Sequence, residues 1–169
     1  MKRSKEYDYP LLCAIGCIFF IIYILQYTDG VFSKSGIFPQ LMLSCTVFSA
    51  MFFGDGVGAA FGFVAGALVD AVSAGAICFN TIIMMLLGYV CGLSVKFFIN
   101  NNFRSAVLVS VATSFIYYFC KWCNLGFGTL RFKEQIAPSC FLTILFSAPI
   151  YAIIYFAVRI RKRQLLKRK

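Results

Sequence analysis

Long apolar runs, separated by short polar segments, make up most of the chain and predict its secondary structure. No Asp, Glu, Lys or Arg lies within five long stretches of the sequence: 9–28, 35–54, 71–95, 105–120 and 135–158. Apolar stretches of about 17–25 residues are long enough to cross a bilayer as α-helices. The pattern predicts an all-α integral membrane protein, a bundle of six transmembrane helices in a single domain, 1–169. The predicted spans are approximately 11–27, 37–53, 57–72, 77–98, 105–120 and 136–158, followed by a basic tail at 159–169.

A row of glycines distinguishes the third predicted span. Glycine recurs every four residues and the next position of the row is acidic: Gly54, Gly58, Gly62, Gly66 and Asp70. Residues four apart lie on the same side of an α-helix, so the row is a strip of bare backbone. Each interior glycine costs a helix about 0.8–1 kcal/mol relative to alanine, but in a bilayer small residues let another helix approach closely. The row therefore predicts a helix-packing surface.

The fourth predicted span carries a matching row, in which Asn80, Gly88 and Gly92 are separated by multiples of four residues. A tight turn at 73–76 would join the two spans into an antiparallel hairpin and place Asp70 and Asn80 at similar depth. We expect a hydrogen bond between these side chains and contact between the glycines below them. Each step of four residues also turns about 40° past a full circle around the helix. We therefore expect the two halves of the glycine row to meet different neighbours, with a partner protein or a second copy of the chain at the half that ends in Asp70.

The distribution of basic residues predicts the orientation in the membrane. With both termini in the cytoplasm, twelve of the 16 Lys and Arg residues lie on the cytoplasmic side, as the positive-inside rule requires. Seven of them lie within the last eleven residues: Arg159, Arg161, Lys162, Arg163, Lys167, Arg168 and Lys169. Such a cluster beside a membrane span attracts anionic lipids with about 1 kcal/mol per residue. We interpret the tail as a topology signal and lipid anchor. A docking site for a cytoplasmic protein is the second interpretation. We do not interpret the tail as a nucleic-acid site.

Composition argues against catalysis. The chain is 61% hydrophobic and 13% charged, whereas soluble domains carry about 25% charged residues. It contains no histidine, which removes the commonest general base and the commonest metal ligand. Cys120 and Cys123 form a C-x-x-C pair, but one such pair without a second pair or a histidine is a weak signal. We expect a non-catalytic protein without a metal or a cofactor, and the sequence leaves open whether these two cysteines ever pair.

Three small-residue motifs between residues 53 and 92 carry a resemblance to a known family. They are Phe53-Gly54 with the run Gly62–Asp70, the segment Gly75–Asn80, and the segment Leu87–Gly92. These motifs, with the length and the order of the spans, resemble the bacterial rod shape-determining family MreD. The resemblance implies a membrane scaffold in the bacterial plasma membrane that binds a single-pass MreC-like protein. It also implies a place in the elongation machinery with MreB, RodA and a class B penicillin-binding protein, which directs cell shape and lateral peptidoglycan synthesis.

The resemblance also supplies an alternative function. The MreD fold is similar to that of the substrate-binding S subunits of energy-coupling-factor (ECF) vitamin transporters, which have six helices and glycine-rich spans. Those subunits usually carry an Ala-x-x-x-Ala pattern on the first helix, and the run 11–25 lacks it because Ala14 is its only alanine. They also tend to bind a ligand with polar loops, and the loop 121–135 has suitable side chains. A vitamin-binding subunit of an ECF-type transporter is therefore the second hypothesis.

Overall fold

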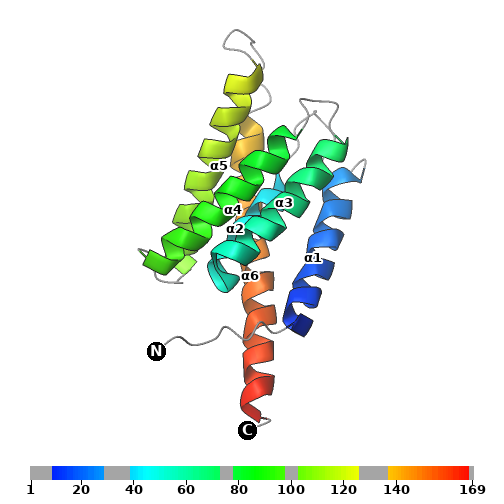
Figure 1. Cartoon of the computed structure of the whole chain (residues 1–169), viewed down its shortest axis with the longest axis vertical. Helices are drawn as coiled ribbons and strands as arrows, with labels where there is room; N and C mark the ends of the chain where they lie inside the picture. The colour runs from blue at the N-terminus through cyan, green and yellow to red at the C-terminus, as the bar shows by residue number, and fades with distance from the viewer. Residues whose placement is uncertain (1–8, 29–38, 73–77, 98–102, 126–136, 168–169) are drawn as a thin grey trace.

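The computed structural model describes residues 9–28, 39–72, 78–97, 103–125 and 137–167. Most residues in each of these segments are helical (Figure 1). The helices are α1 Tyr9–Tyr27, α2 Leu41–Phe53, α3 Asp55–Val72, α4 Phe79–Phe97, α5 Phe103–Leu125 and α6 Ala137–Lys167. One helix lies at each predicted span, so the all-helical architecture is confirmed for the described part of the chain. The predicted turn at 73–76 and the part of the predicted polar loop beyond residue 125 lie outside it.

Five of these helices are long and apolar enough to cross a membrane, and α2 is the exception among the described elements. α2 has 13 residues, which is about 20 Å of helix, whereas the hydrocarbon core of a bilayer is about 30 Å thick. The second predicted span therefore contains a shorter helix than expected, which begins only after Pro39 and Gln40. Both of these residues are buried. Non-helical backbone is tolerated at membrane depth where protein surrounds it.

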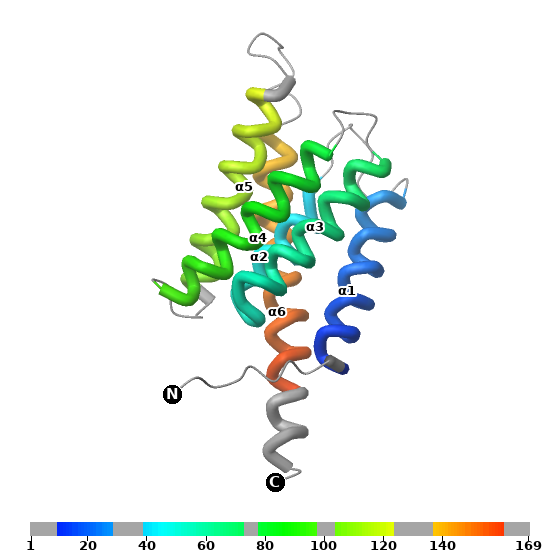
Figure 2. Tube along the Cα trace, viewed as in Figure 1, coloured from blue at the N-terminus to red at the C-terminus, as the bar shows by residue number. Residues whose placement is uncertain are grey.

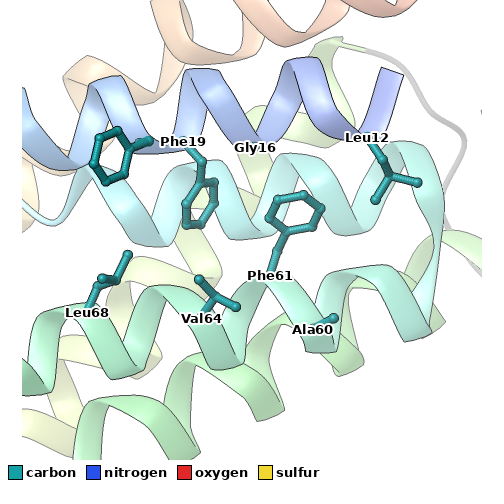
Figure 3. A pocket seen from close by; sticks show the side chains of 8 residues that line it. Leu12, Gly16, Phe19, Ala60, Phe61, Val64 and Leu68 are labelled. Carbon is teal, nitrogen blue, oxygen red and sulfur yellow. The ribbon is translucent and has the colours of Figure 1, made fainter. Parts of the chain in front are cut away.

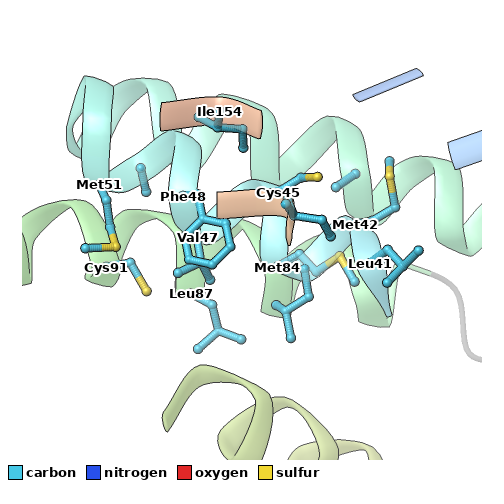
Figure 4. Packing of buried hydrophobic residues seen from close by; sticks show 14 of the residues in the cluster. Leu41, Met42, Cys45, Val47, Phe48, Met51, Met84, Leu87, Cys91 and Ile154 are labelled. Carbon is cyan, nitrogen blue, oxygen red and sulfur yellow. The ribbon is translucent and has the colours of Figure 1, made fainter. Parts of the chain in front are cut away.

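The short helix α2 lies at the centre of the bundle. Eleven of its 13 residues are buried, and it contacts each of the other five helices. A helix without a charged or strongly polar face is stable where protein or lipid covers every side. Phe48 packs edge-on against Tyr151 of α6 at 5.4 Å between ring centroids, and Figure 4 shows Phe48 with Met84 of α4 and Ile154 of α6 in the same cluster.

A single glycine connects α2 to α3. Gly54 has φ 94° and ψ −174°, a combination that is essentially restricted to glycine. Its N–H donates to the Ala50 carbonyl at 2.8 Å, and its own carbonyl accepts from the Gly58 N–H at 2.9 Å. The third helix thus begins at Asp55, two residues earlier than predicted. Gly54 stands at the break between the two helices and is not the first step of the helical row.

The helices α3 and α4 run side by side as a hairpin and form the closest-packed pair among the described elements (Figure 2). α1 lies on the other side of α3, and it packs against α2 and α6 without any close backbone contact to α3. The start of α1 and the end of α6 lie at the same end of the bundle. The helix ends at Tyr27, Val72 and Leu125 therefore lie toward the opposite end, which is called the far end below.

Candidate interaction site

The glycines of α3 lie directly against the backbone of α4 and form what we call the glycine seam: Gly58, Gly62 and Gly66 with Gly88 and Gly92. A Cβ atom added at Gly58 would lie 2.6 Å from the Gly88 carbonyl oxygen. One added at Gly66 would lie 2.6 Å from the Asn80 carbonyl oxygen. Such distances are too short for any real side chain. The two helices thus approach until their backbones touch, which is the use of small residues in membrane helices.

The prediction that the two halves of the row meet different neighbours is wrong for α4, which both halves contact, and it holds only at Gly58, which also meets Ala50 of α2. Gly58 faces Gly88, Gly62 faces Met84, and Gly66 faces Thr81, so the row follows α4 from one end to the other. A row of residues four apart drifts away only from a neighbour that is straight and parallel. Rows of residues four apart are inclined to the helix axis, and two helices that both carry such rows can cross so that the rows stay aligned. The half of the row near Asp70 is therefore filled by α4 and leaves no place there for a partner or a second copy.

The other end of the seam reaches the break between α2 and α3. A Cβ atom added at Gly92 would lie 2.7 Å from the carbonyl carbon of Gly54, and it would also overlap the backbone of Asp55. Gly58 additionally faces Ala50 of α2. The seam thus holds three helices together at this end. The close approach of α4 to Gly54 and Asp55 requires a glycine at position 92.

Asp70 binds the first turn of α4 with both carboxylate oxygens. Its Oδ1 accepts from the Asn80 side-chain amide at 2.8 Å and from the Asn80 backbone N–H at 3.2 Å. Its Oδ2 accepts from the Thr81 hydroxyl at 2.6 Å and from the Thr81 backbone N–H at 2.8 Å. The predicted bond between Asp70 and Asn80 is present. The three other bonds were not predicted.

These bonds make Asp70 the cap of a helix to which it does not belong. The first N–H groups of an α-helix have no partner within the helix, and its N-terminus carries a partial positive charge. The residue before α4 is Cys78, which has φ 62° and whose carbonyl accepts from the Ile82 N–H. A cysteine side chain is a poor acceptor, so a carboxylate from α3 satisfies these donors.

A third helix joins this cluster through Tyr117. The buried Tyr117 hydroxyl of α5 donates to Asn80 Oδ1 at 2.7 Å. Asp70, Asn80, Thr81 and Tyr117 thus form one connected group, called the Asp70 cluster below. Tyrosine near the end of a span is typical of the lipid headgroup region, so the sequence pattern gave no reason to expect a buried hydrogen bond from Tyr117.

A second polar group surrounds the start of α2. Thr143 Oγ1 of α6 accepts from the Gln40 backbone N–H at 2.9 Å and lies 2.9 Å from the Tyr118 hydroxyl of α5. Gln26 Oε1 of α1 accepts from the Met42 N–H at 3.2 Å, and its Nε2 donates to Gln40 Oε1 at 3.4 Å. We call Gln26, Gln40, Thr143 and Tyr118 the Thr143 cluster. Sequence reasoning missed it, although an isolated glutamine inside an apolar run was an available signal.

The two clusters together form a polar layer near the far end of the bundle. Gln26 comes from α1, Gln40 directly precedes α2, and the remaining members come from α3 to α6. The Met42 N–H of α2 is bonded to Gln26. Gln26, Asn80, Tyr117, Tyr118 and Thr143 are each less than 10% exposed. Buried polar groups specify a unique arrangement only when each one has its partner. The layer therefore fixes how all six described helices are placed relative to one another.

The basic tail continues the last helix. α6 extends to Lys167, so Arg161, Lys162, Arg163 and Lys167 are on helical backbone, while Arg168 and Lys169 lie outside the described residues. Arg159 is exposed and its guanidinium lies 6.0 Å from the centre of the Tyr155 ring. α6 has 31 residues, about 46 Å of helix, which exceeds the hydrocarbon thickness by about 16 Å.

No catalytic or metal-binding constellation is found in the described part of the chain. Its Cys, Asp and Glu residues form no group of three or more that could hold a metal, and Cys120 and Cys123 are both free thiols. An apolar groove of about 320 Å³ runs between α1 and α3, lined by residues such as Gly16, Phe19 and Phe61 (Figure 3). A second groove of about 330 Å³ lies between α5 and α6. Both are suited to apolar contacts.

Comparison with known proteins identifies the family. A family model described as the rod shape-determining protein MreD matches residues 9–161, which covers nearly the whole chain. No curated protein and no solved structure matches the chain significantly. The match spans all six described helices from α1 to the membrane-spanning part of α6, in agreement with a multi-pass membrane protein. The chain belongs to the MreD family of rod shape-determining proteins, which confirms the resemblance first seen in its small-residue motifs.

Proposed function

We propose that the chain is a non-catalytic membrane scaffold of the bacterial cell-elongation machinery, located in the plasma membrane. It binds a single-pass MreC-like protein and acts with MreB, RodA and a class B penicillin-binding protein to control cell shape and lateral peptidoglycan synthesis. The observation that carries this proposal is the match to a rod shape-determining family over residues 9–161. The arrangement of the site supports it, because the polar groups of the layer are used in tying helices together and the sides of the bundle are apolar.

A partner in the membrane then has to contact the outer faces of the bundle. The glycine seam is closed by α4 along its whole length, so insertion of a partner helix there would require α3 and α4 to separate. Large apolar side chains project from the outer faces of α1, α3 and α4, as the high exposure of Ile21, Phe63 and Leu86 illustrates. Lateral association without opening the bundle agrees with a scaffold that holds other proteins in place. The row gives no support to a homodimer, and the number of copies is measured most directly by native mass spectrometry of the purified protein.

Co-purification and depletion test the proposal together. An affinity-tagged chain is expected to retain an MreC-like protein after detergent extraction, and an unrelated single-pass membrane protein serves as the control. Depletion of the chain in a rod-shaped host is expected to give rounded or swollen cells, with rescue by the intact gene. Normal cell shape after depletion, together with no retained MreC-like protein, would contradict the proposal.

Ligand binding distinguishes the scaffold from an S subunit of an ECF vitamin transporter. A ligand at 100 times its dissociation constant stabilises a protein by about 2.7 kcal/mol, which is readily seen as a shift of the melting temperature. The two grooves have apolar linings, whereas a specific small-molecule site needs a few placed polar groups. We expect a flat response to a panel of vitamins. A reproducible stabilisation by one of them would favour the transporter hypothesis, together with the S-component-like fold proposed for this bundle.

The basic tail supports the orientation with both termini in the cytoplasm. Seven basic residues follow the last span, and the described ends of the chain lie at one end of the bundle. A fluorescent protein fused after Lys169 is expected to fluoresce, whereas alkaline phosphatase fused at the same point is expected to be inactive. Replacement of all seven basic residues by glutamine is expected to lower the amount of anionic lipid that co-purifies, because each contributes about 1 kcal/mol. An active phosphatase fusion would reverse the proposed orientation.

A further inference from the structure

Two consecutive residues of α5 join the two polar clusters. Tyr117 belongs to the Asp70 cluster through its bond to Asn80, and Tyr118 belongs to the Thr143 cluster through Thr143. We propose that the Tyr117–Tyr118 pair couples the two clusters energetically, so that the far end of the bundle opens and closes as one cooperative unit.

Hydrogen positions in the Thr143 cluster follow from counting. A threonine hydroxyl has one hydrogen to donate and can accept two hydrogen bonds. Thr143 donates to the Ser139 carbonyl at 2.7 Å and accepts from the Gln40 N–H at 2.9 Å. Its remaining capacity is one acceptor site, so the Tyr118 hydroxyl is the donor in the 2.9 Å contact between them. The hydroxyl of Thr143 is thereby saturated.

In the Asp70 cluster, too, the hydrogen-bonding groups of the Asn80 side chain already have partners. The Asn80 side chain donates through Nδ2 to Asp70 and accepts at Oδ1 from Tyr117. Tyr117 is fully buried, so a shift of α5 would leave its hydroxyl without a partner and away from water. An unpartnered buried hydroxyl is strongly unfavourable. Each cluster therefore holds α5 in one position.

The two tyrosines are displaced together when α5 moves as a whole. They are adjacent in a helix, where neighbouring residues are held about 100° apart around the axis. Their rings are in edge-to-face contact, with centroids 5.3 Å apart and an interplanar angle of 81°. A rotation or translation of α5 that breaks the bond to Asn80 therefore also moves Tyr118 away from Thr143. This rigid connection is the physical basis of the proposed coupling.

A double-mutant cycle measures the coupling. Asn80→Ala removes the acceptor of Tyr117, and Thr143→Val removes the partner of Tyr118 with little change of shape. Mutations more than about 7–10 Å apart that share no partner have additive effects. We expect instead a non-additive result. The equilibrium constant for unfolding of the double variant, measured in bicelles, should differ at least about threefold from the value calculated by adding the free-energy changes of the two single variants. In a Tyr118→Phe background this discrepancy is expected to disappear.

Thr113, which lies one turn before Tyr117 in α5, provides a matched control. Thr113 of α5 is buried, but its hydroxyl donates only to backbone carbonyls of its own helix, Val109 and Ser110. Thr113→Val combined with Asn80→Ala is expected to be additive. If Asn80→Ala does not fold, Tyr117→Phe takes its place in the cycle, since it removes only the hydroxyl. Additive behaviour of the folded pair across the two clusters would overturn the proposal.

Hydrogen exchange gives a local measurement at the remote cluster. The Gln40 N–H is protected by Thr143 and the Met42 N–H by Gln26, and neither residue contacts the Asp70 cluster through a hydrogen bond given above. With coupling, Asn80→Ala or Tyr117→Phe speeds exchange of these two amides by at least about threefold. Unchanged exchange at both amides would show that the clusters open independently and would refute the inference.

Discussion

Replacing Gly62 with alanine is expected to destabilise the bundle by about 1–3 kcal/mol, although alanine is the better helix former. The added methyl group would lie 2.8 Å from the Met84 carbonyl carbon and 2.9 Å from the Met85 Cα. Both are backbone atoms, which cannot rotate away as a side chain would. The helices α3 and α4 would have to separate, and every contact of the glycine seam would weaken with them. Gly62→Leu is expected to have a larger effect still, and either variant is measured by unfolding in bicelles.

Gly56→Ala is the matched control for this prediction. Gly56 is in the same helix and is exposed, and a Cβ atom added there meets nothing within 4 Å. The same substitution should therefore be neutral, or stabilising by up to about 1 kcal/mol through helix propensity. The difference between the two alanine variants isolates the close approach of the helices. Equal stability of both variants would mean that α3 and α4 do not touch at Gly62.

Removal of the Asp70 carboxylate is the second substitution with a large expected effect. Asp70→Ala leaves four donors of Asn80 and Thr81 without their acceptor. Two of these donors are backbone N–H groups at the start of α4, which have no alternative within the helix. Because Asp70 is only partly buried, water or lipid headgroups can replace some of the lost bonds. We expect a loss of about 2–4 kcal/mol in the free energy of unfolding, with faster hydrogen exchange in the first turn of α4.

Two further variants show whether the effect comes from capping. Asp70→Asn keeps one acceptor oxygen and is expected to give an intermediate loss. Asp55→Asn removes the other acidic residue of α3, which lies in the first turn and interacts with the helix dipole, so we expect a loss of only about 0.3–1 kcal/mol. If Asp70→Ala and Asp55→Asn were equally mild, Asp70 would not be the cap of α4. A defect in cell shape for Asp70→Ala at normal protein levels would add a functional role to the structural one.

Local sequence patterns identified the parts of the glycine seam but not its course. Gly88 and Gly92 could be recognised as contact partners of the α3 glycines, because residues four apart share a helix face whatever surrounds the helix. The bond between Asp70 and Asn80 followed from the short connection between two antiparallel spans. The single continuous seam did not follow, because the drift of a row matters only relative to the crossing of its neighbour. That crossing is a property of the packed pair.

The polar layer shows the same limit. Gln26, Tyr117 and Thr143 lie in apolar runs of different helices, far apart along the chain. No spacing rule connects them, since their partnership depends on which helices are adjacent around α2. The central position of α2 was also not predicted, because an apolar run has the same appearance whether lipid or protein covers it.

The sequence by itself determined that the chain crosses a membrane, where its helices lie, which face of α3 packs, and which family it resembles. Each of these depends on local properties: hydrophobic length, a four-residue repeat and the order of small-residue motifs. The tertiary structure alone decided that α2 is enclosed, that α4 fills the whole glycine seam, and that Asp70 caps α4. It alone brought polar residues of five helices, together with Gln40 just before α2, into one layer. These features arise from contacts between helices, and the energy of such contacts is determined by the three-dimensional arrangement rather than by any single segment.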